Sequence, residues 1–518
     1  MAGPAAAPLA PLEGSARVWG TIALSAATFM NVLDTSIANV SLPAIAGDLA
    51  VSPNQGTWVI TSFAVSNAIA VPLTGWLAQR FGQVKLFVAS VILFVVASIL
   101  CGLAPNMTIL ITLRAIQGFV AGPMIPLSQA LLLSSYPRAL AGLAMAMWSM
   151  TTLIAPVTGP LLGGWITDNL SWPWIFYINA PVGIMSAFAT WALYRKRESA
   201  TRKVPIDRVG LALLVVWVGA MQIMLDLGKE HDWFHSSLIV ALAIVCVVGF
   251  AFFLAWELTD DHPVVDLRLF KLRNFWTGTL STAIGYGLFF GNVVLLPLWL
   301  QQYMGYRATD AGMIMAPVGV FALLLSPFVG KTVTHSDPRR YVTFAFIVFA
   351  FVLWMRSRFT TETDFWTIMV PTIVQGIATA FFFIPLVTIT LSGLPPDRIP
   401  AASGLSNFAR ISAGAFGTSI ATTMWENRAT LHHAQLAEAI NRGSVAAQST
   451  FSRLSASGMP SQQVLAVINR IVDVQAFTMA ADDIFWISGV LFLVLIPVVW
   501  LSHPTHGAAA GDAAAGAH

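Results

Sequence analysis

The sequence contains fourteen apolar runs of the length that crosses a lipid bilayer, and these runs constrain the fold more than any other feature. A helix of about 20 apolar residues spans the hydrocarbon core. Hydrophobic residues make up 57% of the 518 positions, charged residues 10%, and the mean hydropathy is +0.74, which excludes a soluble globular chain. The sequence therefore predicts an all-α polytopic membrane protein. The runs lie near 20–43, 55–78, 85–104, 108–132, 141–166, 174–194, 207–226, 236–257, 275–301, 309–329, 341–356, 366–391, 401–424 and 480–501.

The lysine and arginine residues between these runs predict the orientation of the chain. With the N-terminus in the cytoplasm, the inside segments hold 17 of them and the outside segments hold 8. Both termini are therefore expected in the cytoplasm. Arg356 and Arg358 shorten the run at 341–356 and are placed outside. The start of the chain lacks the pattern of a removable signal peptide, so we expect none.

The chain resembles itself at an offset of about 258 residues. QGFVAGPMIPL at 117–127 matches QGIATAFFFIPL at 375–386, and VPLTG at 71–75 matches SPFVG at 326–330. The sequence thus predicts two six-helix halves plus two inserted helices, an architecture that binds substrate between the halves. The expected units are a cytoplasmic segment at 1–19, a first half at 20–194, a basic linker with two inserted helices at 195–274, a second half at 275–502 with an outside loop at 425–478, and a cytoplasmic tail at 503–518.

Polar side chains recur on one face of several runs. In the first run they fall within an arc of about 140° on a helix, so that they face protein or water instead of lipid. Similar faces occur in the runs at 108–132 and 401–424. We expect the uncharged members to line a substrate cavity. These are Asn31, Thr35, Asn39, Gln117, Gln129, Gln375 and Asn407.

Asp34 is the charged member of the first polar stripe, and ionisable groups inside a membrane usually mark ion or substrate pathways. An apolar environment favours a protonated carboxyl group, whereas a nearby guanidinium favours the ionised form. We therefore interpret Asp34 as a proton-coupling group with Arg114 or Arg410 as its partner; water alone is a third possibility, and a purely structural ion pair is the alternative. Asp226 is either a relay group or a water-facing helix end.

Glycine and proline residues mark two segments where helices can approach closely or bend. APVTGPLLGG at 155–164 predicts either a bending helix or a tightly packed static pair. GWLAQRFGQVK at 75–85 predicts a tight cytoplasmic connection, or ordinary positive-inside anchoring. The residues expected to serve conformational change are Gly75, Arg80, Gly82, Lys85, Gly118, Gly159, Pro160, Gly163 and Gly164.

Motifs for other classes of protein are missing from the sequence. Cys101 and Cys246 lie far apart in separate apolar runs, so we expect neither a disulfide nor a metal cluster, and His432 and His433 do not suggest a metal site. The phosphate loop of an ATP-driven pump and the common hydrolase motifs do not occur, so we expect a transporter and not an enzyme. An ion channel is disfavoured by the internal duplication.

Five motifs resemble the major facilitator superfamily, and specifically its fourteen-span drug:proton antiporter branch. They are LDTSIANVSLP at 33–43, GWLAQRFGQVK at 75–85, LRAIQGFVAGPMIP at 113–126, APVTGPLLGG at 155–164 and WPWIFYINAPVG at 172–183. The likeness covers nearly the whole chain and is greatest for the Emr-type efflux pumps of Gram-negative bacteria. Gln79, Gln83 and Pro173 depart from the general pattern; an acidic residue is usual at the first of these positions.

The resemblance implies an inner-membrane exporter of hydrophobic drugs in exchange for protons, with the proton gradient as energy source and no cofactor. It also implies an EmrA-like periplasmic adaptor and a TolC-like outer-membrane channel as partners. The amphipathic segments in the loop at 425–478 suit adaptor docking; a self-packed cap is the alternative. Proton-coupled uptake and export of one specific metabolite are the rival functions.

Overall fold

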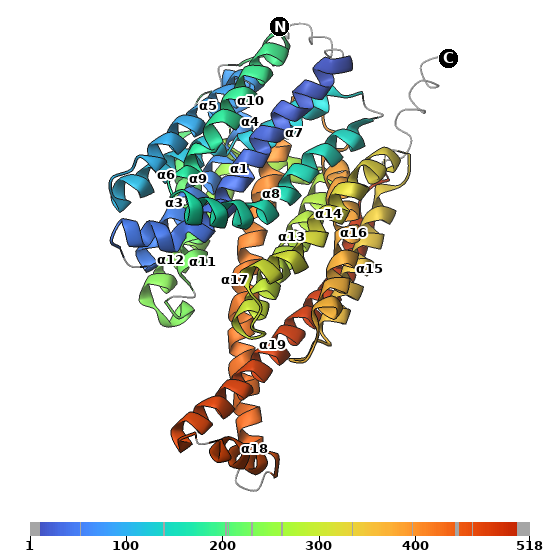
Figure 1. Ribbon diagram of the computed structural model, residues 1–518. Coiled ribbons are helices and arrows are strands. Elements are labelled where there is room, and N and C mark those ends of the chain that lie inside the picture. Colours follow the sequence, from blue (N-terminus) through green and yellow to red (C-terminus); the bar gives the residue numbers. More distant parts are fainter. Residues whose placement is uncertain are drawn as a thin grey trace.

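The computed structural model describes residues 11–504, apart from 52, 138–139, 203–204, 206, 229–230, 261–262, 334, 396, 441–444 and 458. The regular elements of this part of the chain are helices (Figure 1). The expected segments at 1–19 and 503–518 therefore lie largely outside the described residues.

The first half contains a long opening helix and several helices that are broken at proline or glycine. Two of the expected spans are each divided into two helices. In the span at 55–78 the two helices, Trp58–Ala70 and Thr74–Phe81, meet at an angle of 62°. In the span at 108–132 the helices Met107–Ala121 and Met124–Ser135 are separated by Gly122 and Pro123. Pro72 lies in the first of these breaks, and proline lacks the N–H that would continue the helical hydrogen bonds. The helices are α1 (Gly14–Asp48), α2 (Pro53–Gly56), α3 (Trp58–Ala70), α4 (Thr74–Phe81), α5 (Gln83–Gly102), α6 (Met107–Ala121), α7 (Met124–Ser135), α8 (Ala141–Asn169), α9 (Trp174–Tyr177) and α10 (Asn179–Tyr194).

The insert and the second half follow with longer unbroken helices. The insert consists of α11 (Arg208–Leu227) and α12 (Ser237–Thr259), with short 3-10 turns at Arg195–Arg197, Trp233–His235 and Leu267–Lys271. The second half consists of α13 (Arg273–Gln302), α14 (Ala308–Thr332), α15 (Pro338–Arg356), α16 (Phe365–Leu391), α17 (Ile399–Ala439), α18 (Val445–Ala456) and α19 (Ser461–Trp500).

Among the described residues, eleven helices are long and apolar enough to cross a membrane, or twelve if the bent pair α3 and α4 forms one span. The two remaining expected spans, 141–166 and 401–424, fold as the helices α8 and α17, both long enough to cross a membrane, and α17 is the less apolar of the two. In α17 this follows from the polar face with Ser403, Asn407 and Arg410. Fourteen spans therefore remains a prediction, as does the cytoplasmic location of the termini.

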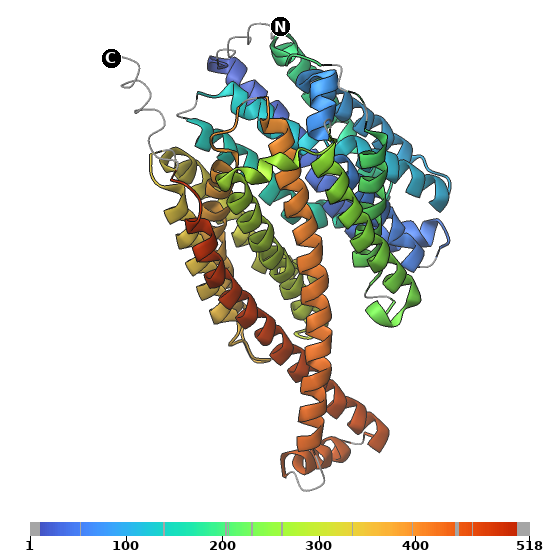
Figure 2. The same cartoon turned by 180° about the vertical axis from the view of Figure 1, so that it is seen from behind.

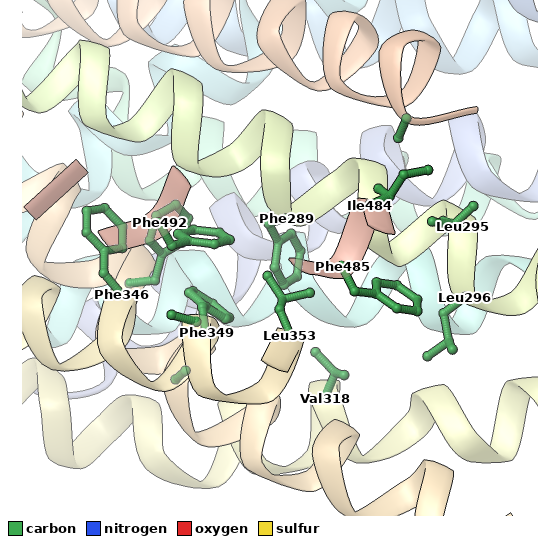
Figure 3. Close-up of a cluster of buried hydrophobic side chains, with 14 of the residues drawn as sticks. Phe289, Leu295, Leu296, Val318, Phe346, Phe349, Leu353, Ile484, Phe485 and Phe492 are labelled. Carbon is green, nitrogen blue, oxygen red and sulfur yellow. The ribbon is translucent and has the colours of Figure 1, made fainter. Parts of the chain in front are cut away.

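Each half has its own apolar core. Phe289, Phe349 and Phe492 belong to the core of the second half and bring α13, α15 and α19 together (Figure 3). A separate cluster joins the insert to both halves: Trp217 of α11 shares it with Ile69 of α3 and Leu405 of α17. Of the two inserted helices, α11 thus packs along the seam between the halves, and α12 packs against α11.

The segment expected as an outside loop at 425–478 forms a helical hairpin instead. α17 continues without interruption to Ala439 and α19 starts at Ser461, so that the two helices extend beyond the rest of the bundle with α18 at the tip (Figure 2). The indole Nε1 of Trp425 donates to the carbonyl oxygen of Phe477, 2.8 Å away, and ties the two helices together. The prediction of helices in this segment is confirmed. The prediction that a loop separates them from the spans at 401–424 and 480–501 is wrong, because α17 and α19 each continue from the span into the hairpin.

The halves approach each other closely at the end where α17 begins. A Cβ atom on Gly330 of α14 would lie 2.7 Å from the carbonyl oxygen of Gly142 in α8, and one on Gly75 of α4 would lie 2.6 Å from the Cβ of Ala401. The start of α1 and the end of α19 lie on this same side of the molecule (Figure 1). If the termini are cytoplasmic, the structure is closed toward the cytoplasm.

Candidate functional site

Asp34 of α1 is fully buried and forms an ion pair with Arg114 of α6. The Asp34 Oδ2 atom and the Arg114 Nη1 atom are 2.5 Å apart, and neither side chain is exposed. Of the partners that the sequence left open, the structure selects Arg114. Buried ion pairs of this kind are sensitive to the loss of one partner, because the remaining charge is left in an apolar environment.

Two amides complete the surroundings of the carboxylate. Gln117 accepts from Arg114 Nη1 at 2.7 Å and donates to Asp34 Oδ1 at 3.3 Å. Asn179, at the start of α10, donates to the same Oδ1 at 2.9 Å and to the hydroxyl of Ser98 at 3.0 Å. We call Asp34, Arg114, Gln117 and Asn179 the Asp34 cluster. It joins α1, α6 and α10 inside the first half.

The guanidinium of Arg114 is held on three further sides. Its Nε donates to the carbonyl oxygen of Val59 at 3.0 Å. The ring of Phe63 lies 4.3 Å from the guanidinium carbon and that of Phe176 lies 5.5 Å away. Such cation–π contacts are worth more where water is excluded. The cation therefore has a fixed place even when its carboxylate partner is neutral.

Protonation of Asp34 would change this cluster chemically. An ionised carboxylate accepts all three hydrogen bonds from Arg114, Gln117 and Asn179, whereas a protonated one carries no charge to attract the guanidinium. The link between α1 and α6 would weaken as a result. A buried acid tied to a fixed cation is thus suited to couple proton binding to the relative position of two helices.

The expected glycine contacts connect this cluster with neighbouring helices. Gly118 lies against the backbone of Phe63, where a Cβ atom would collide with the carbonyl oxygen. In α8, Gly159 contacts Ser36 and Gly163 contacts Ile37, both within one turn of Asp34 on α1. α8 is helical without a break from Ala141 to Asn169. The side chain of Pro160 lies outside the described residues, and its bending role, like that of Gly164, stays a prediction.

The connection between α4 and α5 has a carboxylate that sequence reasoning missed. Gly82 has a φ of +90°, a backbone conformation that favours glycine. Glu198, from the linker after α10, accepts from the backbone N–H groups of Val84 at 3.0 Å and Lys85 at 2.9 Å. The side chains of Arg80 and Lys85 are exposed. The start of α5 thus receives a carboxylate from a distant segment, close to the α4 position where Gln79 stands in place of the usual acid.

Between the two halves, Gln129 of α7 meets the polar face of α17. Its Oε1 atom accepts from Asn407 Nδ2 at 2.8 Å and from the hydroxyl of Ser403. A cavity of about 20 Å³ adjoins these groups and is lined by residues of both halves, including Trp148 and Arg410. Of the residues expected to line a substrate cavity, Gln129 and Asn407 are therefore brought together, and Ser403 joins them.

Arg410 lies in this cavity and not beside Asp34. Its Nη2 donates to Asn407 Oδ1 at 2.9 Å, and its guanidinium carbon is 4.8 Å from the centre of the Tyr286 ring. No ion pair to Arg410 occurs in the part of the chain that the structure describes. Arg114 and Arg410, the two candidate partners of Asp34, therefore lie in different sites: Arg114 beside Asp34 and Arg410 in the cavity between the halves.

The remaining polar residues of the prediction are dispersed. Asn31 is buried and donates to the carbonyl oxygen of Ala121 at 3.2 Å. Thr35 is half-buried, and Asn39 is exposed and donates to the Thr35 carbonyl oxygen, so neither joins the Asp34 cluster. Asp226 lies at the end of α11 with an exposed side chain and a 3.5 Å contact to Gln222, and both interpretations of its role stay predictions.

Comparison with known proteins identifies the superfamily that the sequence motifs resemble. The model of the Major Facilitator Superfamily matches residues 24–418. The chain is 52% identical to the multidrug export protein EmrB of Escherichia coli K12 over 509 residues, which are 98% of this chain and 99% of that protein. It is 49% identical to the fatty acid resistance protein FarB of Neisseria gonorrhoeae, over 95% of this chain and 97% of that protein.

A solved structure has the same fold at low sequence identity. The crystal structure of the human organic anion transporter MFSD10 aligns with a TM-score of 0.59 and 11% identity, over 93% of this chain and 99% of that one. At this identity the likeness concerns the fold alone.

Proposed function

Because this chain belongs to the major facilitator superfamily, we propose that it is a multidrug exporter of the bacterial inner membrane, driven by proton antiport through Asp34. The observation that carries the proposal is the fully buried Asp34–Arg114 pair, in a chain that is 52% identical to a multidrug export protein over nearly its whole length. The similarity to exporters favours efflux over the uptake alternative.

The proposed coupling runs from the Asp34 cluster through two helices to the other half. Proton binding weakens the tie between α1 and α6. α1 then shifts against the small face of α8, which contacts it at Gly159 and Gly163. α8 in turn contacts α14 at Gly142, so a movement of α1 reaches the second half at the closed end. Substrate bound between the halves would respond to the protonation of Asp34 by this route.

Partners follow from the same proposal. The extended hairpin of α17, α18 and α19 projects beyond the bundle on the side away from the chain ends (Figure 2). With the termini in the cytoplasm this is the periplasmic side, and the exposed apolar side chains of Leu465 and Ile471 lie on the hairpin. We assign the hairpin as the docking surface for an EmrA-like adaptor, which would lead to a TolC-like channel.

Efflux can be measured in cells that express the chain, with several unrelated hydrophobic compounds. Accumulation should be low with an intact proton gradient and should rise to the level of cells without the transporter when an uncoupler collapses the gradient. Cells that lack the transporter are the control for effects of the uncoupler itself. Accumulation that is higher with the transporter and an intact gradient would establish uptake instead.

A narrower substrate class, amphipathic carboxylates, is favoured by Arg410. This arginine lines a cavity between the halves and lies beside the amide of Asn407 and the ring of Tyr286, without a carboxylate partner among the described residues. A carboxylate at the end of an apolar chain would neutralise its charge while the chain contacts Phe383 and Trp148. The 49% identity to a fatty acid resistance protein is in line with this class.

Arg410→Gln tests this narrower class. It should lower the efflux of a long-chain fatty acid about tenfold, because a hydrogen bond to a charged group contributes roughly 1.5 to 3 kcal/mol. Efflux of an uncharged dye should change little. Arg410→Lys keeps the charge and should retain part of the fatty acid efflux. An equal loss for both substrates in Arg410→Gln would show that Arg410 does not select carboxylates.

A further inference from the structure

The internal repeat places a second buried arginine in the other half of the molecule. At the offset of 258 residues the positions of the first buried cluster correspond as follows: Asp34 to Asn292, Ser98 to Arg356, Arg114 to Thr372 and Gln117 to Gln375. In the first half the arginine is on α6, whereas in the second half it is on α15, which corresponds to α5. The second half has an asparagine at the position that corresponds to Asp34. We call Asn292, Arg356, Thr372 and Gln375 the Arg356 cluster.

Arg356 is completely buried, although it is the last residue of α15. Its Nη2 donates to Gln375 Oε1 at 2.6 Å and to Thr372 Oγ1 at 3.1 Å. Its Nε and Nη1 atoms have no hydrogen-bond partner among the described residues. No carboxylate forms an ion pair with it in the described part of the chain.

Asn292 corresponds in the repeat to the acid of the first half. It is 3% exposed, its Nδ2 donates to the carbonyl oxygen of its own helix at Leu288, 2.6 Å away, and its Oδ1 has no partner in the described structure. A cavity of about 10 Å³ lies between Asn292 and Gln375. Its apolar lining consists of Phe289, Phe349, Val352, Leu353 and Phe492, most of them visible in Figure 3.

The charge of Arg356 requires compensation. A guanidinium stays protonated in proteins, and a buried charge without a counter-ion is strongly unfavourable. In the first half Asp34 supplies the negative charge at a distance of 2.5 Å. In the second half the corresponding amide supplies none, whereas two guanidinium nitrogens remain available as donors. A water molecule would satisfy hydrogen bonds at this site but would leave the charge in place.

We propose that the Arg356 cluster binds a small monovalent anion such as chloride, held by Arg356 Nε and Nη1 beside Gln375. The anion takes the role that the Asp34 carboxylate has in the first half. Arg356 directly precedes the turn at 357–364, which contains the exposed residues Arg358 and Thr360, so the cluster lies next to the end of the helix and not at its middle. The second half would then carry a fixed ion pair that does not titrate, opposite the titratable pair of the first.

The test is a thermal unfolding titration of the purified full chain, in which sodium chloride replaces sodium gluconate at constant total salt. The apparent Tm should rise with chloride and reach a plateau. Asn292→Asp places a carboxylate where Asp34 lies in the first half, so it should remove the response to chloride and raise the Tm in gluconate. Arg358→Gln, a charge removal on an exposed side chain two residues away, should behave like the unchanged protein.

Two outcomes would overturn the proposal. A Tm that does not change with chloride in the unchanged protein would leave a water molecule, donating to Asn292 Oδ1, as the occupant of the cavity. A chloride response in Arg356→Gln that equals that of the unchanged protein would place the anion elsewhere. Crystals grown with bromide provide a measurement that needs no variant: an anomalous peak is expected beside Arg356, and its absence at full bromide exchange would also contradict the assignment.

Discussion

Asp34→Asn should abolish drug transport driven by an imposed pH gradient in proteoliposomes, while the protein still inserts and folds. Asparagine has the size of aspartate and keeps an oxygen that can accept from Arg114 or Asn179, but it cannot bind and release a proton. Asparagine leaves the Arg114 guanidinium without its counter-ion, so the Tm should fall, and the amount of inserted, folded protein is measured beside transport. Complete loss of gradient-driven transport in the inserted protein is then an effect on coupling.

Asp48→Asn is the matched control for this experiment. Asp48 lies at the exposed end of the same helix and accepts from the indole of Trp172 at 2.8 Å, so the same chemical change there should leave transport intact. Exchange of labelled for unlabelled drug without a pH gradient separates coupling from binding, and Asp34→Asn should retain it. Gradient-driven transport at the normal rate in Asp34→Asn would remove Asp34 from the coupling role.

Rare residue types made part of the candidate site predictable from sequence. An aspartate or arginine in an apolar run is costly, so Asp34 and Arg114 were identified without knowledge of the fold. Their pairing was not predictable, because 80 residues separate them and Arg410 satisfied the same pattern. The choice between the two arginines depends on how the halves pack, and it becomes visible only in three dimensions.

Neutral polar residues gave no comparable signal. Asn179 and Ser98 bind at the Asp34 cluster, but single asparagine and serine residues are common in membrane helices, and the sequence motif around Asn179 was recognised only for its overall likeness. Glu198 lies in a linker that drew attention only for its basic residues. Its contact with the start of α5 depends on a linker path that has no sequence pattern.

Arg356 shows that a residue at the end of an apolar run can be buried in protein. The sequence placed it outside the membrane because it ends such a run, and the structure adds that its side chain is completely buried. The repeat contained the missing information: Gln375 corresponds to Gln117, and a glutamine that binds a guanidinium in one half indicates an arginine near its counterpart in the other. In the segment at 425–478, polar residues suggested a loop although the helices continue through it, because a helix that leaves the bilayer no longer needs an apolar surface.

Arg114→Ala should be the most damaging single substitution of a charged residue in the first half. It removes the cation from Asp34, its bond to Val59 and its contact with Gln117 in one step. Breaking a buried ion pair by removing one partner costs about 3 to 5 kcal/mol, so a marked fall in apparent Tm and complete loss of gradient-driven transport are expected. Arg114→Lys keeps the charge but not the planar set of donors. Its Tm and its transport rate should therefore lie between those of Arg114→Ala and those of the unchanged protein.

The double variant Asp34→Asn with Arg114→Gln separates stability from coupling. It leaves no buried charge in the cluster, so its Tm should recover most of the loss seen in Arg114→Ala, because neighbouring groups in one network do not contribute additively. Transport driven by the pH gradient should stay absent, since no group that binds a proton remains at the site. Arg398→Ala, at an exposed position just before α17, is the control for loss of an arginine. Restored transport together with restored Tm would show that the pair is structural, because stability alone would then account for every effect of its removal.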